Sequence, residues 1–74
     1  MLDVQEAQQA RALQHAMTRA GISPSQLWWH YYSLSGDADE LELEAYLYQA
    51  LHLPRLERLM LDHALRELIN DRPG

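Results

Sequence analysis

The 4 histidines are the residues of this chain best suited to bind a metal or transfer a proton, but their spacing fits no such site. A zinc protease places two histidines one helical turn apart around a glutamate, and a di-iron bundle uses Glu-x-x-His pairs. Here the histidines are scattered along the chain: His15, His30, His52 and His63. The sequence therefore predicts no metal site and no cofactor held by histidine.

The stretch Asp37-Ala38-Asp39 begins like a calcium-binding loop, in which oxygen ligands recur at fixed positions. The pattern then fails, because Leu41 and Leu43 occupy ligand positions and Tyr48 stands where the bidentate acid belongs. The 3 glycines are isolated, so no phosphate-binding loop is present, and no His–Asp pair is placed to activate a serine. We therefore expect a protein that is not an enzyme and that uses no cofactor.

Charge divides the chain into neutral ends and an acidic middle. The formal net charge is −5, and no Lys or Arg occurs between Ala20 and Pro54. The acidic residues of this middle segment are Asp37, Asp39, Glu40, Glu42 and Glu44. Such a segment repels nucleic-acid phosphates and attracts basic surfaces, although acidic residues are also what the first turn of a solvated helix prefers.

Size and composition limit the chain to one small domain. Its 74 residues suffice for a single core, and a hydrophobic fraction of 47% is ordinary for a folded chain. There is no cysteine for a disulfide and no apolar run of the roughly 18 residues that a membrane span needs. Asp3 and Glu6 near the N-terminus are atypical of a signal peptide. We expect a soluble, cytoplasmic protein that does not bind membranes.

Capping residues predict two helices in the first part of the chain. Asp3 and Glu6 resemble an acidic capping box, and with the glycine at position 21 they bound a helix of about residues 3–20. The apolar stripe of this helix is thin: Leu2, Ala10, Leu13, Met17 and Ala20. A second helix begins at Ser23, which has proline and glutamine at the favoured positions after it, and ends at Gly36.

Two further helices are expected in the second part of the chain. Asp37 as N-cap, with Glu40 three residues later, opens a third helix. This helix is expected to reach residue 52 or 53, because the residue before Pro54 avoids helical conformation. Pro54 then opens a fourth helix that ends near Asn70.

The predicted fold class is all-α, a compact bundle of three to four short helices. Residues 1–74 would form a single helical domain with its core in about 22–70, the N-terminal helix of about 3–20 packed across it, and a tail at 71–74. The alternation from Leu41 to Glu44 resembles a strand, but it is too short and is followed by helical spacing.

Two of these helices carry apolar residues on more than one face. On the second helix, Trp29 lies nearly opposite Leu27 and Tyr31. On the third, a second apolar stripe with acidic neighbours lies away from the main one. A helix that is apolar on two faces is either central in its fold or uses one face at an interface. The candidate protein-binding residues are Trp29, Leu41, Glu42, Glu44, Ala45, Tyr48 and His52.

These features predict a small regulatory or adaptor module that binds a basic protein or a second copy of itself. The alternative is a helix-turn-helix DNA-binding or transcription-associated regulator, because a short helix, a glycine-containing turn and a longer helix follow one another. A recognition helix presents hydrogen-bond donors from its first turns, whereas this one would present acids. The sequence therefore disfavours nucleic acid as the partner.

The stretch from Leu27 to Gly36, followed by Glu42 to Leu47, resembles a group of short, all-helical actinobacterial proteins. In that group a helix with a Trp-Trp…Tyr…Gly pattern precedes an acidic helix and a helix rich in Leu, Ala and His. The resemblance covers about residues 22–69 and excludes the first helix. It implies no established activity, so no functional residue is transferred from it.

Overall fold

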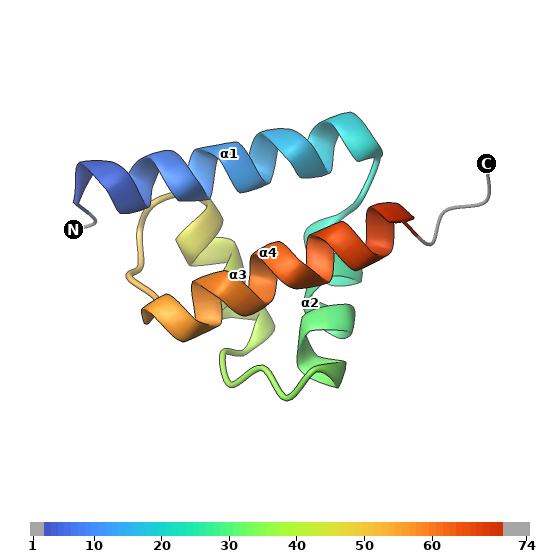
Figure 1. Ribbon diagram of the computed structural model, residues 1–74. Coiled ribbons are helices and arrows are strands. Elements are labelled where there is room, and N and C mark those ends of the chain that lie inside the picture. The colour runs from blue at the N-terminus through green and yellow to red at the C-terminus, as the bar shows by residue number, and fades with distance from the viewer. Residues whose placement is uncertain (1–2, 71–74) are drawn as a thin grey trace.

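The computed structural model describes residues 3–70, which form four helices and no strand (Figure 1). The helices are α1 (Val4–Ala20), α2 (Pro24–Ser33), α3 (Glu40–Leu47) and α4 (Arg55–Asn70). The all-α prediction is confirmed. Leu2 of the predicted apolar stripe and the predicted tail at 71–74 lie outside the described residues.

The helices pack around one core, to which each of them contributes. α2 packs against α3 and α4, while α1 lies across α3 and α4 on the other side (Figure 1). The largest fully buried side chains are Tyr31, Tyr46, Leu27, Leu43, Leu47 and Leu61. α1 adds Ala10, Leu13 and Met17, so its contribution to burial is made by few and partly small side chains.

Local capping explains why α1 and α2 begin where they do. Ser23 and Gln26 form the complete predicted box, with the Gln26 N–H donating to the Ser23 hydroxyl at 3.1 Å and the Ser23 N–H to Gln26 Oε1 at 2.8 Å. Asp3 accepts the N–H of Glu6 at 2.7 Å, as predicted. The second half of that box is wrong, because the Glu6 carboxylate turns instead toward the segment before α4.

The predicted start of α3 at Asp37 is wrong. The N-cap is Asp39, which accepts the N–H of Glu42 at 2.7 Å and donates its own N–H to Glu42 at 3.0 Å. The N–H of Ala38 donates to the Tyr31 hydroxyl at 2.8 Å. Because this bond to another helix holds Ala38 in the loop, the helix opens two residues later than the local pattern predicts.

The predicted end of α3 near residue 52 or 53 is also wrong, since the helix ends at Leu47. Gln49 adopts a left-handed conformation with φ 60°. The N–H of Ala50 donates to the Ala45 carbonyl at 2.8 Å. The N–H of Gln49 donates to the Tyr46 carbonyl at 2.9 Å. This pair of bonds satisfies the last helical carbonyls, so the helix ends several residues before Pro54 would terminate it.

α2 ends in the same kind of turn, but glycine does not occupy the left-handed position. Ser35 has φ 73°, and Gly36 follows it. A Cβ at Gly36 would lie 2.3 Å from Cζ of Tyr31, far inside van der Waals contact. Glycine at position 36 therefore permits the close approach of the Tyr31 ring.

Adding a glycine at position 35 and removing the one at position 36 are expected to change the free energy of unfolding in opposite directions. Ser35→Gly is expected to raise the free energy of unfolding by up to about 1 kcal/mol, because glycine adopts a left-handed conformation without a Cβ penalty. Gly36→Ala is expected to lower it by about 2 kcal/mol, because the Tyr31 ring must shift. Urea denaturation followed by tryptophan fluorescence measures both, and wild-type stability for Gly36→Ala would contradict the packing argument.

Candidate functional site

An aromatic patch lies on the outer side of α2. Trp29 is 65% exposed and Tyr32 is 56% exposed. Half-buried Trp28 joins them, stacked on Tyr32 at a centroid distance of 5.0 Å and edge-on to Trp29 at 5.3 Å. The Trp28 indole N–H donates to the carbonyl of Ala38 at 3.0 Å. One aromatic ring thus anchors a patch whose other two rings face solvent.

A second apolar feature, the α3 stripe, consists of Leu41, Ala45 and Tyr48. Leu41 is 76% exposed and Tyr48 is 70% exposed, with half-buried Ala45 between them. The neighbouring Glu42 and Glu44 are exposed. The sequence left open whether this face of α3 is central or outward, and the structure places it outward.

A hydrogen bond joins the first turn of α2 to the start of α3. The Ser25 hydroxyl donates to a carboxylate oxygen of Glu40 at 2.7 Å. Ser25 lies one turn before Trp29 on the same face of α2, and Glu40 precedes Leu41. We call the aromatic patch, the α3 stripe and the two exposed glutamates beside that stripe the α2–α3 surface.

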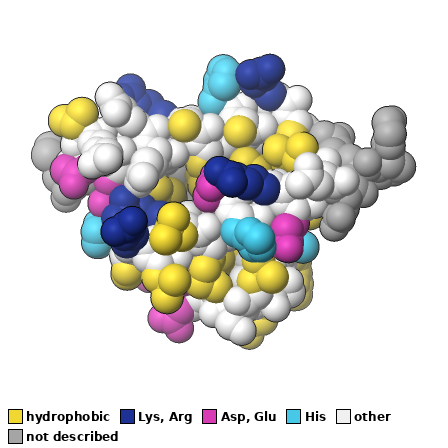
Figure 2. Space-filling model, in the orientation of Figure 1, with side chains coloured by type: hydrophobic (Ala, Val, Ile, Leu, Met, Phe, Trp, Pro, Cys, Tyr) yellow, Lys and Arg dark blue, Asp and Glu magenta, His cyan; other side chains and the backbone are white. Residues whose placement is uncertain are grey.

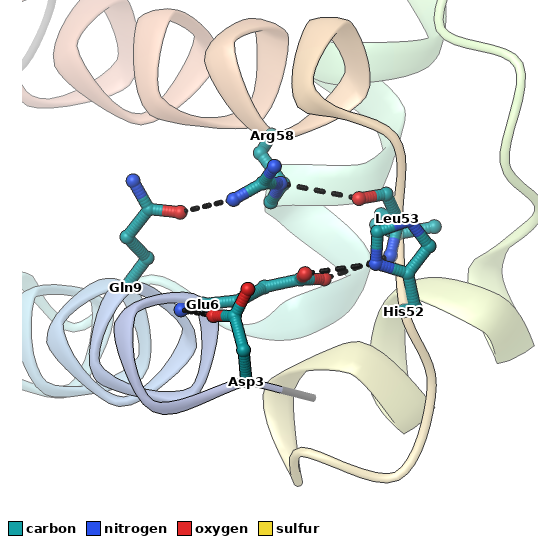
Figure 3. Close-up of polar contacts among 6 residues, drawn as sticks. All are labelled: Asp3, Glu6, Gln9, His52, Leu53 and Arg58. Carbon is teal, nitrogen blue, oxygen red and sulfur yellow. Dashed lines mark hydrogen bonds and ion pairs between the residues drawn. The ribbon is translucent and has the colours of Figure 1, made fainter. Parts of the chain in front are cut away.

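His52 does not belong to this surface, although the helical spacing of the sequence placed it there. Because α3 ends at Leu47, His52 lies in the segment that leads to α4. Its Nδ1 is 2.8 Å from Oε1 of Glu6 on α1 (Figure 3). The side chain of His52 is 61% exposed and acts as a partner of this buried carboxylate.

Glu6 is the centre of a polar cluster that the sequence did not reveal (Figure 3). It is 3% exposed and accepts the N–H of Leu53 at 3.2 Å. Arg58 donates from Nε to the Leu53 carbonyl at 3.1 Å and from Nη1 to Gln9 at 2.6 Å. The cluster ties α1 to the start of α4. Its sequence signal was the place of Glu6 one turn before Ala10, on the inward face of α1.

Tyr31 and Glu57 form a second internal contact that the sequence did not reveal. The Tyr31 hydroxyl donates to Glu57, and the Asp37 N–H donates to the same carboxylate at 3.0 Å. Burial, reinforced by the bond to Glu57, raises the pKa of Tyr31 to about 12. This contact fastens the α2–α3 loop to α4 and so orients the α2–α3 surface.

Two of the remaining histidines converge on one glutamate of α4. His30 Nε2 lies 2.7 Å from Glu67, and His63 Nε2 lies 3.2 Å from it. The hydrogen bond from His30 holds the pKa of Glu67 below its ordinary value of 4.5. Over residues 3–70 no group of three or more His, Cys, Asp and Glu residues is placed to hold a metal ion.

The fold and this surface define the class as a small all-α domain with an exposed aromatic and acidic face. No protein-family model matches the sequence, and no similar curated protein or solved structure is found. None of the helices within residues 3–70 has the length and apolarity to cross a membrane.

Proposed function

We propose that this protein is a non-enzymatic regulatory or adaptor module that binds a basic segment of another protein on the α2–α3 surface. The observation that carries the proposal is the exposure of four large apolar side chains on two packed helices: Trp29, Tyr32, Leu41 and Tyr48. Exposed tryptophan and tyrosine are frequent binding hot spots, and burying such side chains drives association.

Charge favours a basic partner over a second copy of the chain. Glu42 and Glu44 are exposed beside the α3 stripe, and no Lys or Arg occurs between Ala20 and Pro54. A symmetric dimer through this surface would bring like charges together, whereas a basic segment would be attracted and steered to it. The lack of cysteine is consistent with the proposed cytoplasmic location.

The helix-turn-helix alternative has no specific observation in its favour. α3 would be the recognition helix, and it presents exposed Leu41, Glu42 and Glu44. DNA recognition relies on donors to bases and on positive charge near phosphates. These carboxylates would oppose both.

Trp29→Ala is expected to weaken binding of an amphipathic Lys/Leu peptide about tenfold or more, while changing the free energy of unfolding by less than about 1 kcal/mol. Fluorescence and NMR titrations measure binding, and urea denaturation measures stability. Val4→Ala is the matched control, because Val4 is 75% exposed on α1. Equal losses of binding and stability would make Trp29 a structural residue.

Two further arms test the choice of partner. Raising salt from low to moderate concentration is expected to weaken binding of the Lys/Leu peptide, because salt screens the charges at this surface. A Glu/Leu peptide of the same length is expected not to bind. Light scattering across a wide protein concentration range completes the test. A dimer that Trp29→Ala abolishes would show that the partner at this surface is a second copy of the chain and not a basic segment.

A further inference from the structure

A groove of about 630 Å³ lies between α1 and α4, apart from the α2–α3 surface. This volume is within the range of roughly 300–1,000 Å³ that small-molecule sites occupy. Apolar side chains, including Leu13 on α1 and Leu59 on α4, line part of it. Figure 2 shows basic side chains beside hydrophobic and acidic ones at the left, where α4 begins.

Tyr46 points to a ligand in this groove. Its side chain lines the groove although the residue is only 2% exposed. No hydrogen bond to its hydroxyl is made by residues 3–70, so this group is free to bind water or a ligand that enters the groove. Every fully buried polar side-chain atom of the described chain has a partner, so the Tyr46 hydroxyl reaches the open space of the groove. The Tyr46 hydroxyl is protonated at neutral pH and can donate, and burial raises its pKa further above the ordinary value of 10.0.

Two arginines make the same end of the groove electropositive. Arg58 extends from α4 to Gln9 on α1, which leaves its Nη2 without a partner among residues 3–70 (Figure 3). Arg55 also lines the groove and has no hydrogen bond or ion pair within the described chain. Asp62, the acidic lining residue, is paired with Arg66 at 3.1 Å.

Glu6 lies near this end and, in addition to burial, its negative charge raises the pKa of Tyr46, so it offsets part of the positive charge of the two arginines. Both of its carboxylate oxygens accept hydrogen bonds, from His52 and from the Leu53 backbone. The groove therefore combines an apolar floor with unused donors on Tyr46 and the arginines. Guanidinium groups pair with carboxylates through two parallel bonds, and an apolar chain is stabilised by leaving water.

We propose that the α1–α4 groove binds a small amphipathic carboxylate, such as a medium-chain fatty acid, with its carboxylate at Arg55 and the Tyr46 hydroxyl. The apolar chain lies along Leu13 and Leu59. This site is independent of the proposed partner surface, because none of its residues belongs to that surface.

NMR titration of the full chain with octanoate tests the site, with octanol and octylamine as matched probes. Octanoate is expected to shift the amide signals of α1 and α4 residues that line the groove, and to bind about tenfold more tightly than octanol. Arg55→Gln and Tyr46→Phe are each expected to weaken octanoate binding about tenfold. Arg11→Gln is the control, because Arg11 is exposed on α1 outside the groove.

Three outcomes would overturn the proposal: no shift of amide signals at the groove, equal affinity for octanoate and octanol, or equal losses of octanoate affinity in Arg55→Gln and Arg11→Gln. The last would indicate attraction by surface charge alone. Urea denaturation checks that Tyr46→Phe is folded. If that variant is unfolded, the comparison of Arg55→Gln with Arg11→Gln still decides the matter, since Arg55 is exposed. Unchanged signals from Trp29 would separate this site from the partner surface.

Discussion

Glu6→Ala is expected to lower the free energy of unfolding by about 3 kcal/mol. The change removes a charged acceptor from the buried N–H of Leu53 and from His52. A lost hydrogen bond to a charged group and an unsatisfied buried donor each contribute about 1–3 kcal/mol. Small domains are stable by about 0.05–0.15 kcal/mol per residue, so this loss is a large part of the total for 74 residues.

Two variants separate the network from the general effect of mutating α1. Glu6→Gln retains an acceptor for the Leu53 N–H and loses the charge opposite His52, so a loss of about 1 kcal/mol is expected. Gln8→Ala, at an exposed position two residues along α1, is expected to have almost no effect. Urea denaturation gives all three values. Glu6→Ala with the stability of Gln8→Ala would show that the cluster does not hold α1 in place.

Tyr31→Phe is expected to lower the free energy of unfolding by about 2 kcal/mol. The ring stays in the core, but the buried N–H of Ala38 loses its acceptor and Glu57 loses a donor. Tyr48→Phe is the matched control, because Tyr48 is 70% exposed and is expected to change stability little. Similar losses for the two variants would contradict a structural role for the Tyr31 hydroxyl.

The same tyrosine predicts how stability depends on alkaline pH. Burial, together with the bond to Glu57, raises the pKa of Tyr31 from 10.0 to about 12 in the folded chain. The folded state therefore keeps its proton when the unfolded chain loses it. The stability that protonated Tyr31 contributes is fully present below pH 10 and is lost as the pH rises from 10 toward 12. Denaturation across this range should show a shallower decline for Tyr31→Phe, with the raised pKa of Tyr46 accounting for part of what remains.

Features that depend on neighbouring residues were predictable from the sequence. The box at Ser23 and the left-handed glycine at Gly21 were both identified correctly, because every atom involved lies within a few residues. The all-α fold class followed from the same local signals together with the helical spacing of apolar residues. The acidic character of α3 also needed no structure, since it is a matter of residue type.

The boundaries of α3 needed the tertiary structure. Asp37 and Asp39 both have a glutamate three residues later, so local chemistry does not choose between them. The choice is made by Tyr31, whose hydroxyl holds Ala38 in the loop. Because α3 ends early, at Leu47, His52 does not lie on the α3 stripe. A contact with a distant residue again decides its position, since His52 pairs with Glu6 on α1.

The sequence by itself determined an all-α bundle of three to four helices with an acidic third one. It also determined that Trp29 and the α3 stripe could not share the main apolar faces. Only the tertiary structure decided that these side chains face solvent, that Glu6 is buried, and that a groove lies over Tyr46. The physical reason is that helical spacing defines which residues share a face. Whether another helix covers that face depends on packing between segments that are distant in the chain.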